Sequence, residues 1–552
     1  MKSIKKVSLL ITSLMCLSSC SFPFDSSLDL KSSSLSPSSS SSLAYSISYS
    51  SSGSSLSSKP SSEPRNVYFY ALNDFHGACD VKNYEAGIVK VGSFFKEKGQ
   101  EDNTLILNSG DMFQGSLVSS SNKGEFLTEV MNNIQFDAFS LGNHEFDWGQ
   151  EYIKKNRELK DEKTGYKTPF LSSNIYKYDM NKKKVGEYAS ELGDKYVTYT
   201  LANGLKVGII GGIGARQITS ITSSYVDDLS FEDPVGVTKT LSNKLRSEEK
   251  CDVVVLDIHA GQGDLLDTGL TSISASTHKR YVDAVFCAHT HQRENSIENG
   301  VPFVQGGCNG QAYAYVNLRV DKDGNVTCAD YETPYTSSID VKADQEIVDL
   351  YNEYSQKYNG REFICRTDGR MSSRTRGSGT LLPDIATEAI AWAAQNKGNG
   401  FHLDYALCNQ GRDDLASGEV TYNDLYKSLP FDNKVYVIEV SGQDLRKEIE
   451  YNSFTRLDKG VLKNSSKYTI AVIDYLAVHR NYRRNYDYFP SFRMLGTLTD
   501  NGSEYTYREM TRDYLSYLNA RDGKITVKDH ANSLGIHNAD SLSSTLNETF
   551  SF

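Results

Sequence analysis

The chain has 552 residues, of which 38% are hydrophobic and 23% are charged, and its formal net charge is −11. This length allows two or more domains with sizeable cores, and the composition is ordinary for a globular protein. The acidic balance argues against a surface that binds a nucleic-acid polymer, since such a surface is normally basic. A phosphorylated substrate would therefore need local positive charge from metal ions or a few arginines.

Residues 1–20 are predicted to be an export signal. A lysine-containing start precedes an apolar stretch over 7–17 that is too short for a typical membrane span. The segment ends in Leu-Ser-Ser-Cys, which resembles the lipobox of bacterial lipoproteins. The resemblance implies that Cys20 is lipidated and that the protein is extracytoplasmic, anchored to the bacterial cell membrane through Cys20. The alternative is a cleaved secretory peptide with an incidental cysteine.

Residues 21–62 are dominated by serine and show no periodic apolar pattern. Such a segment cannot bury enough apolar area to fold, so we expect a disordered tether. Seven cysteines follow it, an odd number without a CxxC pair. One or two disulfides are possible in an exported protein, but their pairing cannot be derived from the sequence. Cys251 and Cys287 adjoin apolar runs, which favours burial.

Short apolar runs recur between residues 66 and 335. They are rich in β-branched and aromatic residues and are bounded by Gly, Asn or Asp, which predicts buried strands. The runs lie at 67–72, 104–107, 138–141, 205–210, 253–256 and 284–286. Helical patterns such as 87–98 lie between several of them. The sequence therefore predicts an α/β fold.

A polar block follows the end of five of these predicted strands. The blocks begin at Asp74, Gly110, Gly142, His259 and His289. Ligand sites in α/β proteins gather at the carboxyl ends of strands, so we expect the five blocks to form one site. Carboxylate and amide oxygens mixed with imidazoles suit Zn, Mn, Fe or Co. Two such ions that share a bridging carboxylate can hydrolyse a phosphate ester.

A helical pattern over 338–360 separates two differently patterned halves and predicts a connecting helix. Beyond it, helices are predicted at 381–394 and 508–518, and strands at 435–440 and 468–472. We expect a metal-binding domain over 63–337, the linker helix over 338–360 and a second domain over 361–552.

The blocks resemble the motifs of calcineurin-like metallophosphoesterases, and more narrowly those of the 5′-nucleotidase family. They read Asn-Asp-Phe-His-Gly from 73, Gly-Asp-Met-Phe-Gln-Gly-Ser from 110, Gly-Asn-His-Glu-Phe-Asp-Trp-Gly from 142, Ile-His-Ala-Gly from 258 and Ala-His-Thr-His from 288. The family includes bacterial UDP-sugar hydrolases and 2′,3′-cyclic phosphodiesterases. The resemblance extends over 66–500 and implies an N-terminal two-sheet αββα domain and a C-terminal α/β substrate-binding domain.

The resemblance also implies roles for the residues of the blocks. One metal ion would be held by Asp74, His76, Asp111 and His291. The other would be held by Asp111, Asn143, His259 and His289, with Asp111 bridging the two. His144 would stabilise charge on the phosphate, oriented by Asp147, and a metal-bound hydroxide would be the nucleophile.

For the second domain, the resemblance implies a set of substrate-binding residues. Phe431 and Asn433, in Pro-Phe-Asp-Asn, would stack on and hydrogen-bond a nucleobase, with Tyr475 as a second stacking ring. The remaining candidates are Arg370, Arg374, Arg376, Asn409 and Arg412. Two departures matter: the loop around Asn409 is shorter than the family pattern, and the acid that binds ribose is replaced, leaving only Asp487 as a candidate.

The sequence thus predicts an exported phosphoesterase with two divalent metal ions that converts nucleotides to nucleoside and phosphate. Within the same chemistry, it could instead hydrolyse 2′,3′-cyclic nucleotides or UDP-sugars. A different class, an inactive lipoprotein that only binds a ligand, is opposed by the complete set of metal-type residues. The predicted partners are a nucleotide or related phosphate ester and the membrane; no protein partner is implied.

Overall fold

A computed structural model describes residues 46–48, 63–81, 85–376, 380–457, 460–478, 480–481 and 486–527. The predicted export signal, with Cys20, lies outside the described residues, as does most of the serine-rich stretch. A short strand, β1 (Ser46–Ser48), lies within that stretch and pairs in parallel with β8 (Tyr196–Thr200). Among the described residues, none of the helices has the length and apolar character needed to span a bilayer.

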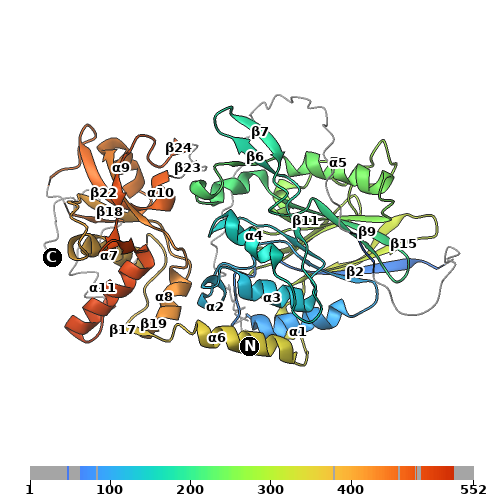
Figure 1. Ribbon diagram of the computed structural model, residues 1–552, viewed down its shortest axis with the longest axis horizontal. Helices are drawn as coiled ribbons and strands as arrows, with labels where there is room; N and C mark the ends of the chain where they lie inside the picture. Colours follow the sequence, from blue (N-terminus) through green and yellow to red (C-terminus); the bar gives the residue numbers. More distant parts are fainter. Residues whose placement is uncertain are drawn as a thin grey trace, which may run out of the picture. The chain divides into compact units, whose positions relative to one another are not determined.

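The first domain contains two β-sheets, which Figure 1 shows with their flanking helices. One sheet has the order β16-β15-β2-β3-β4-β5 and the other β1-β8-β9-β11-β12-β14-β13. In the first, β2 is Arg65–Leu72, β3 Thr104–Asn108, β4 Ala138–Ser140, β5 Phe170–Leu171, β15 Ala314–Val320 and β16 Val326–Glu332. In the second, β9 is Lys206–Ile213, β11 Val253–His259, β12 Ala284–Phe286, β13 Arg293–Glu298 and β14 Val301–Gly306. The six predicted strands are confirmed.

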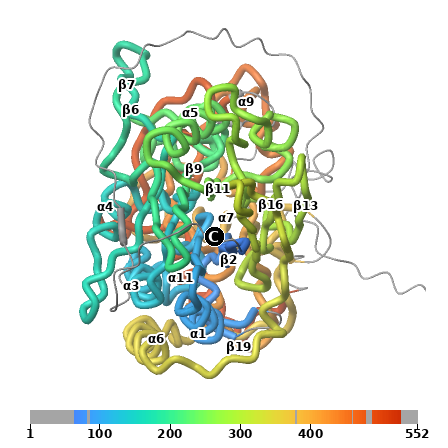
Figure 2. Tube along the Cα trace, turned by 90° about the vertical axis from the view of Figure 1, so that its right-hand side faces the viewer, coloured from blue at the N-terminus to red at the C-terminus, as the bar shows by residue number. Residues whose placement is uncertain are grey.

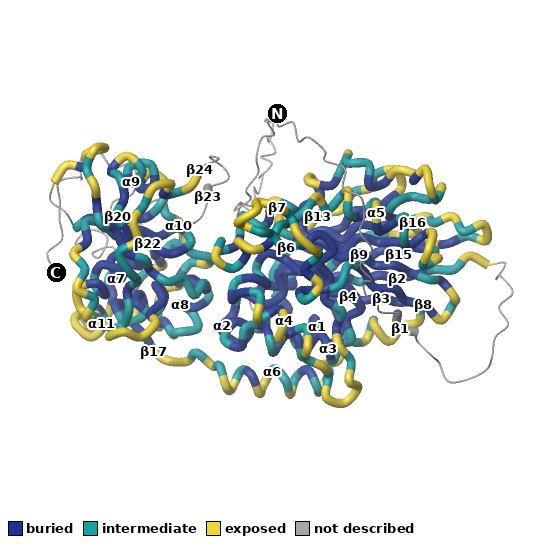
Figure 3. The backbone as a smooth tube through the Cα atoms, turned by 45° about the horizontal axis from the view of Figure 1, so that its top comes forward, coloured by how far each residue is buried: buried dark blue, intermediate teal, exposed yellow. Residues whose placement is uncertain are grey.

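The two sheets pack face to face around an apolar core. Phe69 of β2 and Phe286 of β12 lie in opposite sheets with ring centroids 5.6 Å apart. Figure 3 shows β3 and β9 as largely buried. Helices α1 (Gly87–Gly99) and α3 (Glu125–Ile134) join a second apolar cluster, and α5 (Pro234–Ser247) joins a third. The αββα arrangement predicted for this domain is therefore present.

The predicted connecting helix is α6 (Gln345–Lys357), shorter than the 338–360 stretch expected. It begins at Asp344, whose carboxylate accepts hydrogen bonds from the backbone N–H groups of Glu346 and Ile347 and so caps the helix. Ile347 and Tyr354 pack into the cluster of the first domain, and α6 lies beside α1 in Figures 1 and 2. The linker is thus anchored on the first domain rather than free.

The second domain is a mixed sheet with the strand order β21-β18-β22-β20-β25. Its strands are β18 (Tyr405–Cys408), β20 (Val435–Ser441), β21 (Ser453–Arg456), β22 (Lys467–Ile473) and β25 (Arg493–Thr497). Helices α7 (Leu382–Asn396) and α11 (Tyr507–Asp522) contribute to its core. The predicted helices and strands of this half are confirmed within a few residues. All seven cysteines after Cys20 are free thiols, and Cys251 and Cys287 are buried as expected.

Candidate metal and active site

The five polar blocks lie at the carboxyl ends of five strands. Asp74 follows β2, Asp111 follows β3, and Asn143 follows β4, all in one sheet. His259 is the last residue of β11, and His289 follows β12, in the other sheet. Because the strands within each set run parallel, their ends share an edge. The blocks therefore form one site, as the sequence predicts.

Seven predicted ligand side chains come together in this site. Two groups have ligand atoms that all lie within 4.8 Å of one another, namely Asp74, His76 and His291, and Asp111, His259 and His289. The Asn143 side-chain oxygen adjoins the second group, 3.2 Å from His259 Nε2 and 3.0 Å from His289 Nδ1. These are the seven side chains that the sequence assigns to two metal ions.

Asp111 lies between the two groups. Its Oδ2 is 3.1 Å from His259 Nε2 in the second group and 3.9 Å from His76 Nε2 in the first. The other oxygen, Oδ1, accepts a hydrogen bond from the backbone N–H of His144 at 2.8 Å. One carboxylate oxygen thus faces both groups, which is the geometry that a bridging ligand requires.

Hydrogen bonds fix which nitrogen of two histidines faces the site. His76 Nδ1 lies 3.1 Å from the Gln114 carbonyl, and His259 Nδ1 lies 2.8 Å from the Ser109 carbonyl. A carbonyl only accepts, so each Nδ1 carries the proton. In the neutral rings Nε2 then presents a lone pair to the other ligand atoms. Lone pairs that converge in this way repel one another unless a cation lies between them, so the donor set fits divalent metal ions.

Protonation tendencies agree with this interpretation. Burial lowers the pKa of His289 to about 3 and that of His291 to about 4, which leaves both imidazoles neutral and able to bind metal. Burial opposes the charged form of His259 as well, but Asp111 outweighs it and raises the pKa of His259 to about 9. A cation in the second group would displace that proton. Burial also raises the pKa of Asp74 to about 7.

The backbone around the ligands is strained and closely packed. Asp111 has a φ of +55°, in the left-handed region that non-glycine residues rarely adopt. A Cβ on Gly110 would lie 2.6 Å from the Gly142 nitrogen, and a Cβ on Gly142 would lie 2.3 Å from Asp111 Oδ1. Only glycine at both positions lets the β3 and β4 loops approach this closely, which explains the Gly-Asp and Gly-Asn-His spacing.

Glu145 clamps the same two loops together. Its buried carboxylate accepts hydrogen bonds from the backbone N–H groups of Asp111, Met112 and Gly142 at 2.9, 2.9 and 2.7 Å. Burial and the nearby Asp111 carboxylate raise the pKa of Glu145 to about 7, so above that pH the three bonds are charge-assisted and hold the strained loop firmly. The side chain belongs to the Gly-Asn-His-Glu block, although the sequence alone did not reveal its role.

His144 points into the site without joining either group of ligands. Its Nδ1 lies 2.8 Å from Asp147 Oδ2, and its Nε2 lies 3.3 Å from Arg412 Nη2 of the second domain. Burial acts to lower the pKa of His144, but the Asp147 and Asp111 carboxylates outweigh it and raise the pKa above its usual value. Asp147 therefore orients the ring and favours its charged form, whereas the Arg412 guanidinium acts against that form. An anion that accepts from both side chains would relieve this repulsion.

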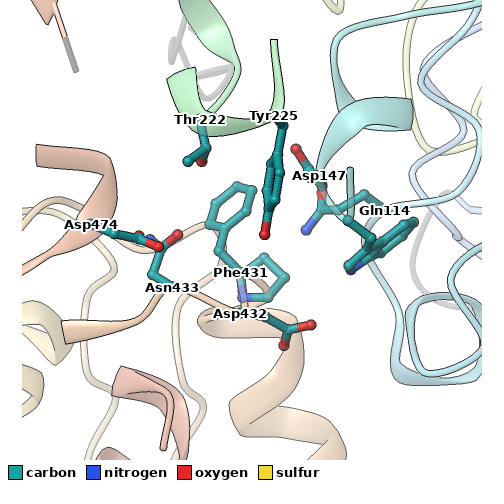
Figure 4. A pocket seen from close by; sticks show the side chains of 10 residues that line it. Gln114, Asp147, Thr222, Tyr225, Phe431, Asp432, Asn433 and Asp474 are labelled. Carbon is teal, nitrogen blue, oxygen red and sulfur yellow. The ribbon is translucent and has the colours of Figure 1, made fainter. Parts of the chain in front are cut away.

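A pocket beside His144 is lined by side chains of both domains (Figure 4). Gln114, Asp147 and Tyr225 come from the first domain, and Phe431 and Asn433 from the second. The Phe431 ring stacks on the His144 ring with centroids 5.8 Å apart and planes inclined by 25°. Two of the predicted nucleobase-binding residues, Phe431 and Asn433, thus lie next to the predicted catalytic histidine.

The other predicted substrate-binding residues lie outside the lining of this pocket. One of them, Arg412, contacts His144. Arg370 is exposed and pairs with Asp414, and Arg374 is exposed. Arg376 lies over the Tyr451 ring at 5.4 Å.

Three more candidates lie apart from the pocket. Asn409 is half-buried and lies directly after β18. Tyr475 packs near Tyr488, with ring centroids 6.4 Å apart. Asp487, the candidate ribose-binding acid, is exposed, whereas the buried acid that lines the pocket is Asp474.

Several residues of the site were not identified from the sequence. Gln114 and Glu145 belong to quoted blocks, so their position in those blocks was an available signal. Thr222 and Tyr225 come from a short 3₁₀ segment of the first domain, and no motif marks them. Only the fold brings that segment to Phe431.

Two protein families match the chain. Residues 67–293 match the calcineurin-like phosphoesterases, and residues 363–461 match the C-terminal domain of 5′-nucleotidases. Endonuclease YhcR of Bacillus subtilis is 26% identical over 408 residues, which are 69% of this chain and 32% of that protein. A 5′-nucleotidase of Vibrio cholerae is 22% identical over 451 residues, which are 73% of this chain and 78% of that protein. The chain thus spans about a third of the Bacillus relative's length.

Solved structures share the fold. A 5′-nucleotidase precursor from Thermus thermophilus superposes with a TM-score of 0.63 at 18% identity, covering 82% of this chain and 97% of that one. A putative 5′-nucleotidase from Staphylococcus aureus, in complex with α-ketoglutarate, gives a TM-score of 0.61 at 19% identity with the same coverage. At these identities the likeness establishes the two-domain architecture.

Proposed function

The chain belongs to the 5′-nucleotidase family of calcineurin-like phosphoesterases, and from this premise we propose that it hydrolyses nucleotides to nucleoside and phosphate with two divalent metal ions. The observation that carries the proposal is Asp111 Oδ2, which faces a histidine of each ligand group. His144 donates its backbone N–H to the other oxygen of Asp111, and its ring contacts Asp147 and Arg412. Together they form a site for an anionic phosphate ester.

The proposed ligands of one ion are Asp74, His76, Asp111 and His291, and those of the other are Asp111, Asn143, His259 and His289. Bound there, Zn, Mn, Co or Fe ions would polarise the phosphoryl oxygens and lower the pKa of a water molecule. The carbonyl partners of His76 and His259 hold these rings with Nε2 directed into the site, and they would raise ligand basicity.

We propose that His144 and Arg412 bind the phosphoryl group next to the ligand groups. The two nitrogens already lie 3.3 Å apart, so one oxyanion beside the pair could accept a hydrogen bond from each. Asp147 would stabilise the charged imidazole as negative charge develops on the phosphate. Because these groups are held in place before the substrate binds, little reorganisation would be needed during reaction.

Phe431 and Asn433 support a nucleotide rather than a small phosphate ester as the substrate. Phe431 offers an aromatic face next to His144, and Asn433 offers both a donor and an acceptor in the same pocket. An aromatic side chain stacks on any nucleobase, and an amide can hydrogen-bond its edge. The base would therefore lie one ribose away from the phosphate site.

A substrate panel after chelation tests the proposal. The protein is stripped with a chelator and then assayed after addition of Mn, Co or Zn. The panel contains nucleoside mono-, di- and triphosphates, UDP-glucose, 2′,3′-cyclic nucleotides and a small aryl phosphate. We expect release of phosphate from nucleoside monophosphates that chelation abolishes and metal restores. Turnover that is indifferent to the chelator would refute the metal mechanism.

We further propose that the enzyme acts outside the cytoplasm, anchored to the cell membrane through Cys20. The basis is the export pattern of residues 1–20 and the serine-rich stretch that follows it. An enzyme in this location would release nucleosides and phosphate for uptake. Replacing Cys20 by Ser should move the protein from the membrane fraction to the medium, and labelling with a radioactive fatty acid should be lost. An unchanged distribution would refute the anchor.

A further inference from the structure

Gln114 occupies a central position that the proposed mechanism leaves unused. It lies in the loop after β3, three residues beyond Asp111, and only 1% of its surface is exposed. Its backbone carbonyl accepts the Nδ1–H of His76 at 3.1 Å. Its side-chain oxygen accepts a hydrogen bond from Arg412 Nη2, also at 3.1 Å. One residue therefore contacts a proposed metal ligand and the arginine of the second domain.

Arg412 fixes the orientation of the Gln114 amide. A guanidinium only donates hydrogen bonds, so the amide oxygen must face Arg412. Rotation of the amide by 180° would bring two donors against each other. The NH₂ group is consequently directed away from Arg412. Figure 4 shows the Gln114 side chain on the wall of the pocket that Phe431 and Asp147 also line.

The NH₂ group of Gln114 has no hydrogen-bond partner among the described residues, although the atom is buried. A buried donor without a partner costs free energy, and native proteins rarely retain one without a reason. Gln114 belongs to the lining of the pocket, and its amide oxygen contacts Arg412, which in turn contacts His144. An oxyanion held by Arg412 and His144 would be within the same cluster of donors.

We propose that Gln114 binds the phosphoryl group through its NH₂ and, through its oxygen, positions Arg412 for the same group. This inference rests on the proposed function and names a further substrate contact within it. Arg412 Nη2 is shared, 3.1 Å from Gln114 Oε1 and 3.3 Å from His144 Nε2. Gln114 thereby fixes the arginine of one domain against the catalytic histidine of the other, and its own donor completes the oxyanion site.

The test measures equilibrium binding of inorganic phosphate to the metal-loaded full chain by calorimetry, so it does not depend on turnover. Gln114→Met keeps the length of the side chain but removes both hydrogen bonds. Because a hydrogen bond to a charged group contributes about 1.5–3 kcal/mol, we expect phosphate to bind at least about tenfold more weakly. Metal content should be unchanged, because the carbonyl that holds His76 belongs to the backbone. The matched control is Gln217→Met, another buried glutamine of this domain, which should bind phosphate like the wild type.

A double-mutant cycle separates the two parts of the inference. If Gln114 positions Arg412, Gln114→Met should weaken phosphate binding much less when Arg412 is already replaced by Ala. The loss that remains in that background measures the direct contact of the NH₂ group. Equal losses in both backgrounds would overturn the positioning role. Unchanged phosphate binding in Gln114→Met would overturn the inference as a whole.

Gln114→Glu keeps the inference testable if the Met variant does not fold. It retains an acceptor for Arg412 but replaces the donor by a carboxylate oxygen, which repels phosphate. We expect it to bind phosphate more weakly than Gln114→Met does, and wild-type affinity would refute the donor. The substrate panel tests hydrolysis and does not depend on these binding measurements. If the wild type binds phosphate but hydrolyses no ester, the proposed function is refuted and the Gln114 contact is not.

Discussion

Replacing Glu145 by Gln tests whether the carboxylate clamp holds the bridging ligand. Glu145 Oε2 accepts the N–H groups of Asp111 and Gly142, and Oε1 accepts that of Met112. The amide oxygen of Gln could take the place of Oε2 and keep two bonds. Its NH₂ would then face the N–H of Met112, so one buried donor loses its partner. A charge-assisted bond contributes about 1.5–3 kcal/mol, and we expect a loss of about 2–3 kcal/mol in the free energy of unfolding.

Urea unfolding in the presence of a chelator measures this loss without the contribution of bound metal. The control is Glu187→Gln on β7 (Lys184–Tyr188), an exposed glutamate whose replacement should change the free energy of unfolding by less than about 0.5 kcal/mol. Metal titration of the folded variants then measures affinity. Residues that orient a ligand typically change metal affinity by about 10–100-fold, and we expect a loss of that order in Glu145→Gln.

Two outcomes would contradict this reasoning. A Glu145→Gln variant as stable as the control would mean that the three amide bonds contribute little to the native state. A variant that is destabilised but binds metal with wild-type affinity would mean that the clamp stabilises the fold without positioning Asp111. Unfolding and metal binding are measured independently. The stabilising role of Glu145 and its role in positioning Asp111 can therefore be refuted separately.

Three further substitutions separate the remaining parts of the site and fold. His144→Ala should lower kcat about a hundredfold or more while metal content, measured by mass spectrometry, stays unchanged; loss of metal would make His144 a ligand. Phe431→Ala should raise the KM for nucleotides about tenfold, which corresponds to the loss of one stacked base. The KM for a small aryl phosphate should not change, and an equal rise in KM for both substrates would exclude stacking. Burial raises the pKa of Asp137 to about 8, so the native state holds its proton more tightly than the unfolded chain, and wild-type stability should fall as pH rises from about 4 to about 8. Asp137→Asn should make this decline less steep in urea unfolding at several pH values, since Asp74 and Asp384, whose pKa burial also raises to about 7, contribute the rest. A parallel decline in both proteins would assign it entirely to other groups.

The metal site could be predicted from the sequence because each of its blocks is local. A strand, a turn and one or two ligands lie within a few residues, and parallel strands bring their ends to a common edge whatever the connections between them. His259 illustrates this, since it ends the apolar run of β11 and its neighbours in space follow directly from strand order. Its tautomer could not be predicted, because the Ser109 carbonyl that fixes it is 150 residues away.

The substrate pocket was harder to predict because its residues depend on how loops of two domains approach one another. Tyr225 lies in a 3₁₀ segment without a motif, and only the contact with the second domain gives it a possible role. Asp474 directly precedes the predicted Tyr475, yet the acid lines the pocket and the ring packs near Tyr488. Whether Tyr225, Asp474 and Tyr475 line the pocket depends on the direction of their side chains. The sequence pattern does not specify this direction in short helices and loops.

Backbone strain connects the clamp, the glycines and the proposed metal ions. Five of the seven proposed ligands have left-handed backbone angles, with φ of +46° at Asp74, +49° at His76, +55° at Asp111, +75° at His289 and +60° at His291. Each such residue costs on the order of 1 kcal/mol or more, so the arrangement persists only where its surroundings enforce it. Around Asp111 that enforcement is visible in the amides held by Glu145 and in the close approach that Gly142 allows. A loop fixed in this way presents its carboxylate before any ion arrives. Metal affinity should then depend on residues that never touch the metal, which is why the Glu145 measurement bears on the whole site.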